Sequence, residues 1–226
     1  RSLIAGLLAL PGTMRAEDYS ASSPNGKITA TVSLTDGKLT YHVEKDGRTL
    51  VKNSPLGLRT TLADLTVGLD FVSSGKAEVD DTYTLPTGKQ RQYRDHCNVL
   101  SVVTQKDGLR QTVQFRLYDD GFAFRYVLPK YGSNAKVTLT GEASRIRVAK
   151  FSSCLACKFI GNIQVPNYPY EGLYTNYTSW ASLTSAPDDR LNSPTLASDG
   201  TDYLLLSEAD NRGTFCTSLI KAEQNT

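Results

Sequence analysis

Asp-Gly dipeptides stand between short stretches in which apolar and polar residues alternate, and this pattern constrains the fold more than any other feature of the chain. A tight type I′ turn needs positive φ at both central residues, which Asp and Gly accept more readily than most residues. An Asp-Gly pair between two alternating stretches therefore predicts a β-hairpin. Such pairs include Asp36-Gly37, Asp46-Gly47 and Asp120-Gly121. The chain is predicted to be a series of antiparallel strands joined by tight turns.

The alternation continues along most of the sequence, and no stretch of useful length has a strong helical period. The stretches predicted to be strands cover residues 27–34, 39–44, 65–72, 100–105, 110–117, 122–128, 136–139, 145–148 and 203–206. Alternation of this kind is typical of antiparallel sheets with one buried and one solvated face. The predicted fold class is therefore all-β, a large antiparallel β-sandwich of two sheets.

The most informative stretch covers residues 115–126, which flank the turn at Asp120-Gly121. With a two-residue loop, one face of this hairpin carries the large residues Phe115, Leu117, Phe122, Phe124 and Tyr126, and it is predicted to face the core. Arg116 then lies directly opposite Arg125 on the other face. Like charges so placed repel each other by up to about 1 kcal/mol. Either both side chains splay apart in solvent, or an acidic group from another element or domain lies between them.

The charge balance excludes several function classes. The 226 residues include 25 basic and 23 acidic side chains, a formal net charge of +2, with no basic run. We therefore expect neither nucleic acid nor a membrane surface among the partners. Only two histidines occur, His42 and His96, so a histidine-rich zinc site or a Ser-His-Asp triad is not expected.

The first residues have the pattern of a targeting segment. An apolar run over residues 3–10, too short to span a bilayer, precedes Pro11-Gly12 and a polar stretch that begins at Glu17. Residues 1–16 are predicted to be a partial secretory signal peptide, and the alternative is a buried amphipathic segment. The predicted location is periplasmic or secreted, with a β-sandwich domain over residues 17–226.

Export permits disulfide bonds between the four cysteines Cys97, Cys154, Cys157 and Cys216. Cys154 and Cys157 have the C-x-x-C spacing of redox and metal sites, but no thioredoxin-like βαβ pattern surrounds them. A structural disulfide or plain buried thiols are the interpretations that remain open.

Residues 161–200 break the strand pattern and are rich in Asn, Pro, Tyr, Ser and Thr. They are predicted to be a long loop-like segment, either a surface excursion or, given the aromatic content, an interface or binding surface.

Several segments, in this order, resemble the N-terminal domain of glycoside hydrolase family 97, the bacterial α-glucosidase and α-galactosidase family. The segments are Ser23-Pro24-Asn25-Gly26-Lys27, Leu39-Thr40-Tyr41, Asp46-Gly47, Ser54-Pro55-Leu56-Gly57-Leu58, Tyr93-Arg94-Asp95-His96-Cys97-Asn98 and the hairpin 115–126. The resemblance covers about residues 20–210. Cys97 and Val99 depart from the family's pattern, in which a Tyr and often a Glu are expected.

The resemblance implies a β-super-sandwich that is part of a multidomain protein, truncated at its C-terminal end. A catalytic (β/α)₈ barrel would follow as the partner of this domain, and the substrate would be an α-linked oligosaccharide cleaved by an exo-acting enzyme. The two catalytic carboxyl groups that glycoside hydrolysis needs would come from the barrel, so no catalytic residue is expected in this chain. The pairs Asp80-Asp81 and Asp119-Asp120 are not assigned to catalysis, because neighbouring strand residues point to opposite faces.

The resemblance also implies an active-site Ca²⁺ shared with the barrel, with one ligand supplied by this domain. Glu171, in Tyr170-Glu171-Gly172, is the best match to that ligand. Ca²⁺ takes six to eight oxygen ligands, so one carboxylate must be joined by ligands from the barrel. The alternative is an ordinary loop glutamate.

Two other functions remain open. The chain could be a stand-alone, non-catalytic carbohydrate-binding β-sandwich, in which aromatic side chains stack on sugar rings. The candidates for such stacking are Tyr168, Tyr170, Tyr174, Tyr177 and Trp180. A purely structural extracellular domain is the third hypothesis.

Overall fold

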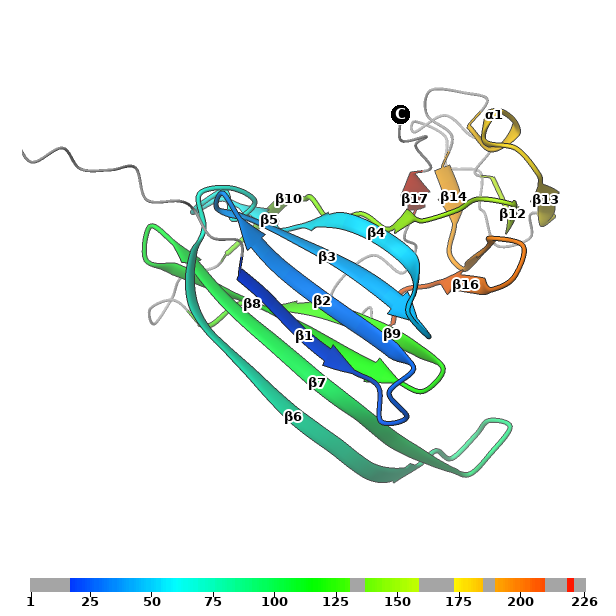
Figure 1. The fold of residues 1–226 in the computed structure, drawn as a ribbon, viewed down its shortest axis with the longest axis horizontal. Helices are drawn as coiled ribbons and strands as arrows, with labels where there is room; N and C mark the ends of the chain where they lie inside the picture. Colours follow the sequence, from blue (N-terminus) through cyan, green and yellow to red (C-terminus); the bar gives the residue numbers. More distant parts are fainter. Residues whose placement is uncertain (1–16, 131–136, 159–172, 185–189, 210–218, 222–226) are drawn as a thin grey trace, which may run out of the picture. The chain divides into compact units, whose positions relative to one another are not determined.

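The computed structural model describes residues 17–130, 137–158, 173–184, 190–209 and 219–221. The chain divides into two compact units, residues 1–146 and residues 147–226. In both units the regular structure is almost entirely β-strand, and the strands pair antiparallel (Figure 1). The predicted all-β class is thereby confirmed.

The first unit contains two large sheets. One has the strand order β1 (Glu17–Ser22), β2 (Ile28–Thr35), β3 (Lys38–Lys45) and β4 (Arg48–Leu56). The other has the order β6 (Asp70–Thr84), β7 (Gln92–Lys106), β8 (Leu109–Tyr118) and β9 (Gly121–Val127). A short pair is formed by β5 (Leu58–Thr60) and β10 (Leu139–Glu142). Each sheet is a meander, because consecutive strands are neighbours.

The two sheets pack face to face around an aromatic centre (Figure 1). Tyr41 of β3 is fully buried, and its ring lies 5.3 Å from that of Phe115 and 5.5 Å from that of Phe124. The other fully buried large side chains of this core are Val32, Leu39, Val43, Val51, Leu56, Leu100, Val102 and Leu117. Alternate residues of β2, β3 and β8 supply this core, so the predicted β-sandwich with one dry face per sheet is confirmed.

The turns at Asp36-Gly37 and Asp46-Gly47 have the predicted geometry, with φ of 50° and 68° in the first and 50° and 74° in the second. Their surroundings differ. A Cβ added to Gly37 would lie 2.9 Å from the Cα of Gly68, whereas one added to Gly47 would have nothing within 4 Å. The first turn therefore needs glycine for a close backbone approach as well as for its φ.

The third predicted turn is displaced by one residue, which shifts the pairing of its two strands by two. Tyr118 pairs with Gly121, so the loop is Asp119-Asp120, and among the described residues neither Asp120 nor Gly121 has positive φ. Arg116 consequently lies opposite Ala123 rather than opposite Arg125. In this position the carboxylate of Asp119 accepts a hydrogen bond of 2.9 Å from the backbone N–H of Asn25, before β2.

The shift leaves the faces of this hairpin unchanged, because side chains alternate with a period of two. Phe115 now pairs with Phe124 and Leu117 with Phe122, and these residues still face Tyr41. Arg125 lies opposite Gln114, whose side-chain oxygen accepts its Nε–H at 2.9 Å. The core face was predicted correctly, and the arginine pair was not.

Residues 65–69 precede β6 rather than forming its start. Leu65 is fully buried, and its carbonyl accepts a hydrogen bond of 2.9 Å from the buried side chain of Gln111. Strand β7 begins at Gln92, well before the predicted start at residue 100. The prediction of a strand over residues 65–72 is therefore correct only from residue 70, because Leu65 and Leu69 are buried from an irregular segment.

The second unit contains a four-stranded sheet in the order β13 (Thr175–Tyr177), β12 (Ser153–Ala156), β15 (Thr195–Ser198) and β16 (Tyr203–Leu206). Its other elements are β11 (Arg147–Val148), the single turn α1 (Trp180–Leu183) and the pair of β14 (Arg190–Asn192) with β17 (Leu219–Lys221). The prediction of one loop-like segment over residues 161–200 is wrong for its described parts. Three short strands and one helical turn lie there, too brief for periodicity to reveal.

The three cysteines that the structure describes, Cys97, Cys154 and Cys157, are buried free thiols. Cys154 points into the core of its unit, and Cys157 accepts a hydrogen bond of 3.3 Å from the side chain of Asn192. For these three residues the structure therefore supports plain buried thiols rather than a structural disulfide. Cys216 lies outside the described residues.

Candidate functional site

The predicted calcium ligand Glu171 lies outside the described residues, as do Tyr168 and Tyr170. In the part of the chain that the structure describes, no three His, Cys, Asp or Glu side chains come together in a way that could hold a metal ion. The calcium site therefore stays a prediction. It would need ligands from beyond this set, since one carboxylate does not complete the shell of a Ca²⁺ ion.

A polar cluster joins β7 and β8 on the side of the sheet away from the aromatic core. The carboxylate of Asp95 accepts hydrogen bonds from Nη1 of Arg116 at 2.7 Å and from the hydroxyl of Tyr118 at 3.0 Å. The side chains of Arg116 and Asp95 retain 33% and 24% of their exposure. The cluster is thus half-buried, where an ion pair is less screened by solvent than at the open surface.

Cys97 and Val99, the two departures from the family's pattern, lie beside this cluster on β7. Both are buried, Cys97 completely. Burial raises the pKa of the Cys97 thiol and that of the neighbouring Tyr118 hydroxyl. These positions act in packing under the Asp95 cluster, and the neutral thiol is no candidate nucleophile.

The hairpin of β6 and β7 carries a second set of charged side chains, in the half nearest its connecting loop. Arg94 binds Asp80 through two hydrogen bonds, 2.6 Å from Nε and 2.7 Å from Nη2. His96 lies 3.5 Å from the carboxylate of Glu78. The hydrogen bond from Arg94 lowers the pKa of Asp80, so that carboxylate is ionised and acts as an ion-pair partner. A catalytic acid would need the opposite shift.

The adjacent carboxylates singled out in the sequence therefore have other tasks. Asp80 binds Arg94, whereas the Asp81 side chain accepts from the backbone N–H of Thr82. Asp119 ties its turn to Asn25. None of these pairs has the facing geometry that glycoside hydrolysis requires of two carboxyl groups.

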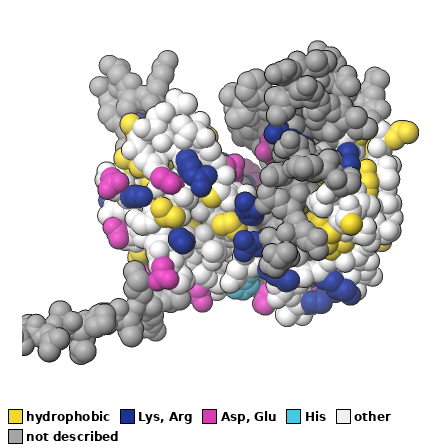
Figure 2. Space-filling view, turned by 90° about the horizontal axis from the view of Figure 1, so that it is seen from above, with side chains coloured by type: hydrophobic (Ala, Val, Ile, Leu, Met, Phe, Trp, Pro, Cys, Tyr) yellow, Lys and Arg dark blue, Asp and Glu magenta, His cyan; other side chains and the backbone are white. Residues whose placement is uncertain are grey.

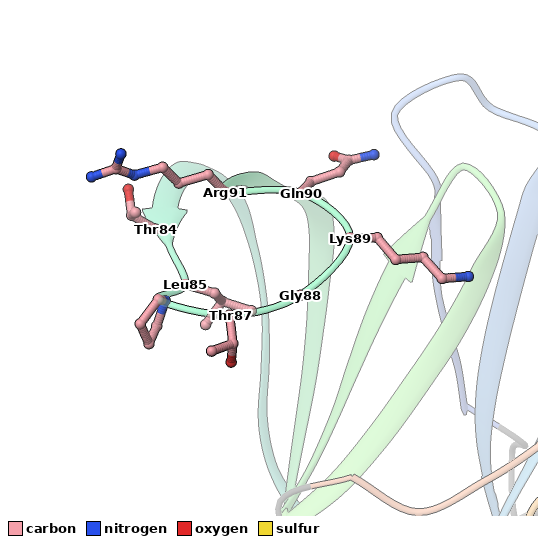
Figure 3. Close-up of a pocket in the computed structure, with 8 residues that line it drawn as sticks. Thr84, Leu85, Thr87, Gly88, Lys89, Gln90 and Arg91 are labelled. Carbon is pink, nitrogen blue, oxygen red and sulfur yellow. The ribbon is translucent and has the colours of Figure 1, made fainter.

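The loop that closes the β6–β7 hairpin surrounds a shallow hollow (Figure 3). Its lining residues all come from this loop, Thr84 to Arg91, and the backbone N–H of Leu85 closes it by donating to the carbonyl of Arg91. Figure 3 shows Lys89, Gln90 and Arg91 pointing away from the centre of the ring. With no side chains converging inside it, this hollow is a feature of the loop's path and not a binding site.

In the second unit, two of the five aromatic residues proposed for sugar stacking, Tyr177 and Trp180, are used for packing. The ring of Trp180 stacks on Phe151 at 4.5 Å, and both contact the buried cluster of Cys154, Ala156, Leu183 and Leu191. Tyr177 packs against the same cluster, with the Lys158 ammonium 5.0 Å from its ring centre. Nothing in this arrangement favours a stacking platform.

On the face seen in Figure 2, the described residues form no large region of a single charge. Figure 2 shows basic and acidic side chains interspersed over the face it displays. No helix among the described residues is long and apolar enough to cross a membrane.

Comparison with known families decides the classification. The family model described as "Glycosyl-hydrolase 97 N-terminal" matches residues 21–226. The chain belongs to this family, the N-terminal domains of glycoside hydrolase family 97 (GH97). Two of the segments that carried the resemblance, 93–98 on β7 and 115–126 on β8 and β9, are neighbours in one sheet, and the ion pair of Asp95 with Arg116 joins them. Sequence reasoning included Asp95 and Arg116 in separate motifs and missed that they pair.

Named relatives agree with the GH97 assignment. A probable retaining α-galactosidase from Streptomyces bingchenggensis (strain BCW-1) is 28% identical over 221 residues, 95% of this chain and 32% of the relative. A retaining α-galactosidase from Bacteroides thetaiotaomicron is 32% identical over 114 residues, 49% of this chain and 16% of the relative. The GH97 chain thus spans about a third of the length of the first of these proteins.

Solved structures share the fold. A β-arabinopyranosidase superposes with a TM-score of 0.73 at 25% identity, over 84% of this chain and 31% of that one. A glycoside hydrolase family 97 enzyme from Pseudoalteromonas sp. strain K8, in complex with panose, has a TM-score of 0.67 at 20% identity, over 80% and 27% of the two chains.

Proposed function

We propose that this chain is the N-terminal domain of an exported, exo-acting, retaining α-galactosidase. The observation that carries the proposal is the family match over residues 21–226, joined to an alignment of 95% of the chain with a relative named for that activity. The domain would have no catalytic activity by itself. The carboxylates of Asp80, Asp95 and Asp119 are committed to Arg94, Arg116 and a turn backbone, and the catalytic pair would come from a (β/α)₈ barrel in the remaining polypeptide.

The choice of sugar rests on the structures of the sugars that the relatives' names contain. A β-L-arabinopyranoside has the ring configuration of an α-D-galactopyranoside and lacks only the C6 hydroxymethyl group. The names α-galactosidase and β-arabinopyranosidase thus describe similar rings, with an axial hydroxyl at C4. An α-glucoside has that hydroxyl equatorial. A site built to hydrogen-bond an axial hydroxyl leaves buried polar groups unpaired with the epimer, which selects strongly against it.

The proposal is tested with the full-length protein and three p-nitrophenyl substrates, the α-galactoside, the β-L-arabinopyranoside and the α-glucoside. The kcat/KM for the α-galactoside is expected to be at least about 100-fold above that for the α-glucoside. The α-glucoside leaves a buried polar group of the site without its hydrogen-bond partner. Nuclear magnetic resonance of the first-formed sugar should show the α-anomer, because two displacements retain configuration. A preference for the glucoside, or a β-anomer as first product, would contradict the proposal.

Exo-action and export have separate tests. With raffinose-type oligosaccharides, an exo-acting enzyme releases free galactose from the first time point and no internal fragments. For export, fractionation of cells that express the natural gene should place the protein outside the cytoplasm, with a mature end near Glu17. Retention in the cytoplasm with residues 1–16 intact would contradict that part.

The calcium ligand role of Glu171 belongs to the same proposal. A hard cation fits a carboxylate and would serve as a fixed positive charge near the sugar. In the full-length protein, Glu171→Gln is expected to lower the bound calcium measured by mass spectrometry and to raise the calcium concentration needed for half-maximal activity. Glu208→Gln, at an exposed position of the same unit, is the matched control. Unchanged metal content in the Glu171 variant would remove this residue from the site.

A further inference from the structure

The edge strand β6 of the first unit is long, regular and exposed. It covers 15 residues and is the outermost strand of its sheet (Figure 1). It pairs with β7 on one side, and among the described residues no strand pairs with its other side. Over residues 73–81 the pairing with β7 has no register shift, and every residue except the half-buried Val79 is exposed. Such an edge presents backbone N–H and C=O groups to which another strand can pair.

Most features that prevent edge pairing are missing from residues 73–81. Natural proteins protect a sheet edge by keeping it short, by proline, by a bulge or by charged side chains. This stretch contains no proline and no bulge, whereas the edge strands β1 and β9 have only 6 and 7 residues. Only the charges remain, and they have both signs, because Lys76 precedes Glu78, Asp80 and Asp81. Whether these charges repel or attract a second strand therefore depends on the register.

The order of the charges fits an antiparallel second copy of β6. A two-fold axis perpendicular to the sheet places one residue opposite its own copy. With the axis at Ala77, the middle residue of β6, Lys76 of each copy lies opposite Glu78 of the other, and opposite charges so placed attract. The small side chain of Ala77 faces itself, and Gly75 faces Val79. This register therefore combines charge pairing with room for the side chains.

The neighbouring registers are unfavourable. Moving the axis by one residue puts either Lys76 or Glu78 opposite its own copy, and like charges directly opposite each other are destabilising. Moving it one residue further puts Glu78 opposite Asp80 in one direction. In the other direction the paired stretch runs into the bulge of β6 between Phe71 and Ser73. The sequence of β6 thus selects the register centred on Ala77.

We propose that β6 pairs antiparallel with β6 of a second copy of this chain, with the two-fold axis at Ala77 and residues 73–81 in the contact. The pairing joins the two four-stranded sheets into one continuous sheet, and the same patch serves on both copies, as a closed two-fold contact requires. Lys76 forms no ion pair within the described part of its own chain, so the second copy supplies its partner. This association does not depend on the proposed activity.

The first test is the oligomeric state of the full-length protein, measured by analytical ultracentrifugation over a range of concentrations. Lys76→Glu places two carboxylates opposite each other at both ends of the contact, and it should raise the dissociation constant of the dimer at least about tenfold. The double variant Lys76→Glu with Glu78→Lys restores opposite charges and should restore the affinity. Lys52→Glu, the same charge change at an exposed position of β4, is the matched control and should leave the dimer unchanged.

Three outcomes of this experiment would overturn the proposal. They are a monomer at every concentration, a dimer that Lys76→Glu leaves intact, and a double variant that does not regain the affinity lost in Lys76→Glu.

The second test determines the register in the full-length protein. Directly opposed residues of an antiparallel pair have Cα atoms about 4.5–5.5 Å apart, which a disulfide bond spans. Ala77→Cys is therefore expected to give a covalent dimer under mild oxidation, seen on a non-reducing gel. The control is Ser74→Cys, whose two copies would lie about 20 Å apart and should not cross-link. Equal cross-linking of both variants, or of neither, would contradict the register centred on Ala77.

Discussion

At the scale of single residues, the carboxylate of Asp95 binds two side chains of the neighbouring strand. It satisfies Arg116 and Tyr118 at once, and all three are partly withdrawn from water. The Asp80–Arg94 pair has equally short hydrogen bonds but lies in the open, where solvent screens it. Geometry alone would rank the two pairs as equal, and burial separates them.

Replacing Asp95 should therefore cost more than replacing Asp80. We expect Asp95→Ala to lower the free energy of unfolding by about 1–3 kcal/mol, because Arg116 and Tyr118 lose a charged acceptor while half-buried. Urea unfolding followed by circular dichroism measures the loss. Asp80→Ala is the control and should have the smaller effect. An equal loss in both variants would show that burial does not distinguish these pairs.

The thiol of Cys154 provides a prediction about pH. Burial raises its pKa to about 11, whereas an unperturbed thiol has a pKa of about 8.5. As the pH rises, the unfolded chain loses this proton before the folded one does. The stability that the neutral thiol contributes is therefore complete below about pH 8.5 and is lost as the pH rises through about 11. Unfolding free energies between pH 7 and pH 10.5 should decline less steeply in Cys154→Ala than in the natural chain.

At the scale of elements, the hairpin turns show that one dipeptide serves in different settings. Asp36-Gly37 and Asp46-Gly47 have the same backbone conformation. Only the first is pressed against another segment, at Gly68. Local sequence predicts the turn, whereas the crowding around it depends on where the rest of the chain lies.

The two turns form a matched experiment. Gly47→Ala should cost about 1 kcal/mol, the strain of an L-residue at positive φ. Gly37→Ala adds a Cβ that would lie 2.9 Å from the Cα of Gly68, so backbone must also shift and the loss should exceed that of Gly47→Ala by at least about 1 kcal/mol. Denaturant midpoints of the two variants provide the comparison, and equal losses would show that the contact with Gly68 yields without cost.

At the scale of the whole molecule, the chain has two compact units with separate cores. The first core is centred on Tyr41, Phe115 and Phe124, and the second on Cys154, Leu183 and Leu191. Each core is formed from its own residues, so a cavity in one should act first on the unit that contains it.

Calorimetry of single-core variants tests this independence. Phe115→Ala removes a fully buried ring and should lower the stability of the first unit by about 3–5 kcal/mol. Leu191→Ala should act on the second unit by about 2–5 kcal/mol. Each substitution is expected to shift one thermal transition and leave the other in place. A common shift of both transitions would show that the units unfold as one.

How much of this protein the sequence determines depends on the range of the interactions. Alternation and Asp-Gly turns are local, and they determine the all-β class, the first two hairpins and the core-facing side of Phe115, Phe122 and Phe124. The GH97 family followed from ordered short segments that needed no structure. The core-facing side survives the two-residue shift in pairing, since side chains repeat their direction with that period.

The tertiary structure decided what depends on distant partners. The turn between β8 and β9 contacts Asn25 through Asp119, and the carboxylate that binds Arg116 is Asp95 on β7 rather than a residue of its own hairpin. In the second unit, Leu155, Leu196 and Leu205 likewise form one row only because three short strands pair in this register. Residues far apart in sequence meet only after the chain folds, and no local pattern encodes which of them will meet.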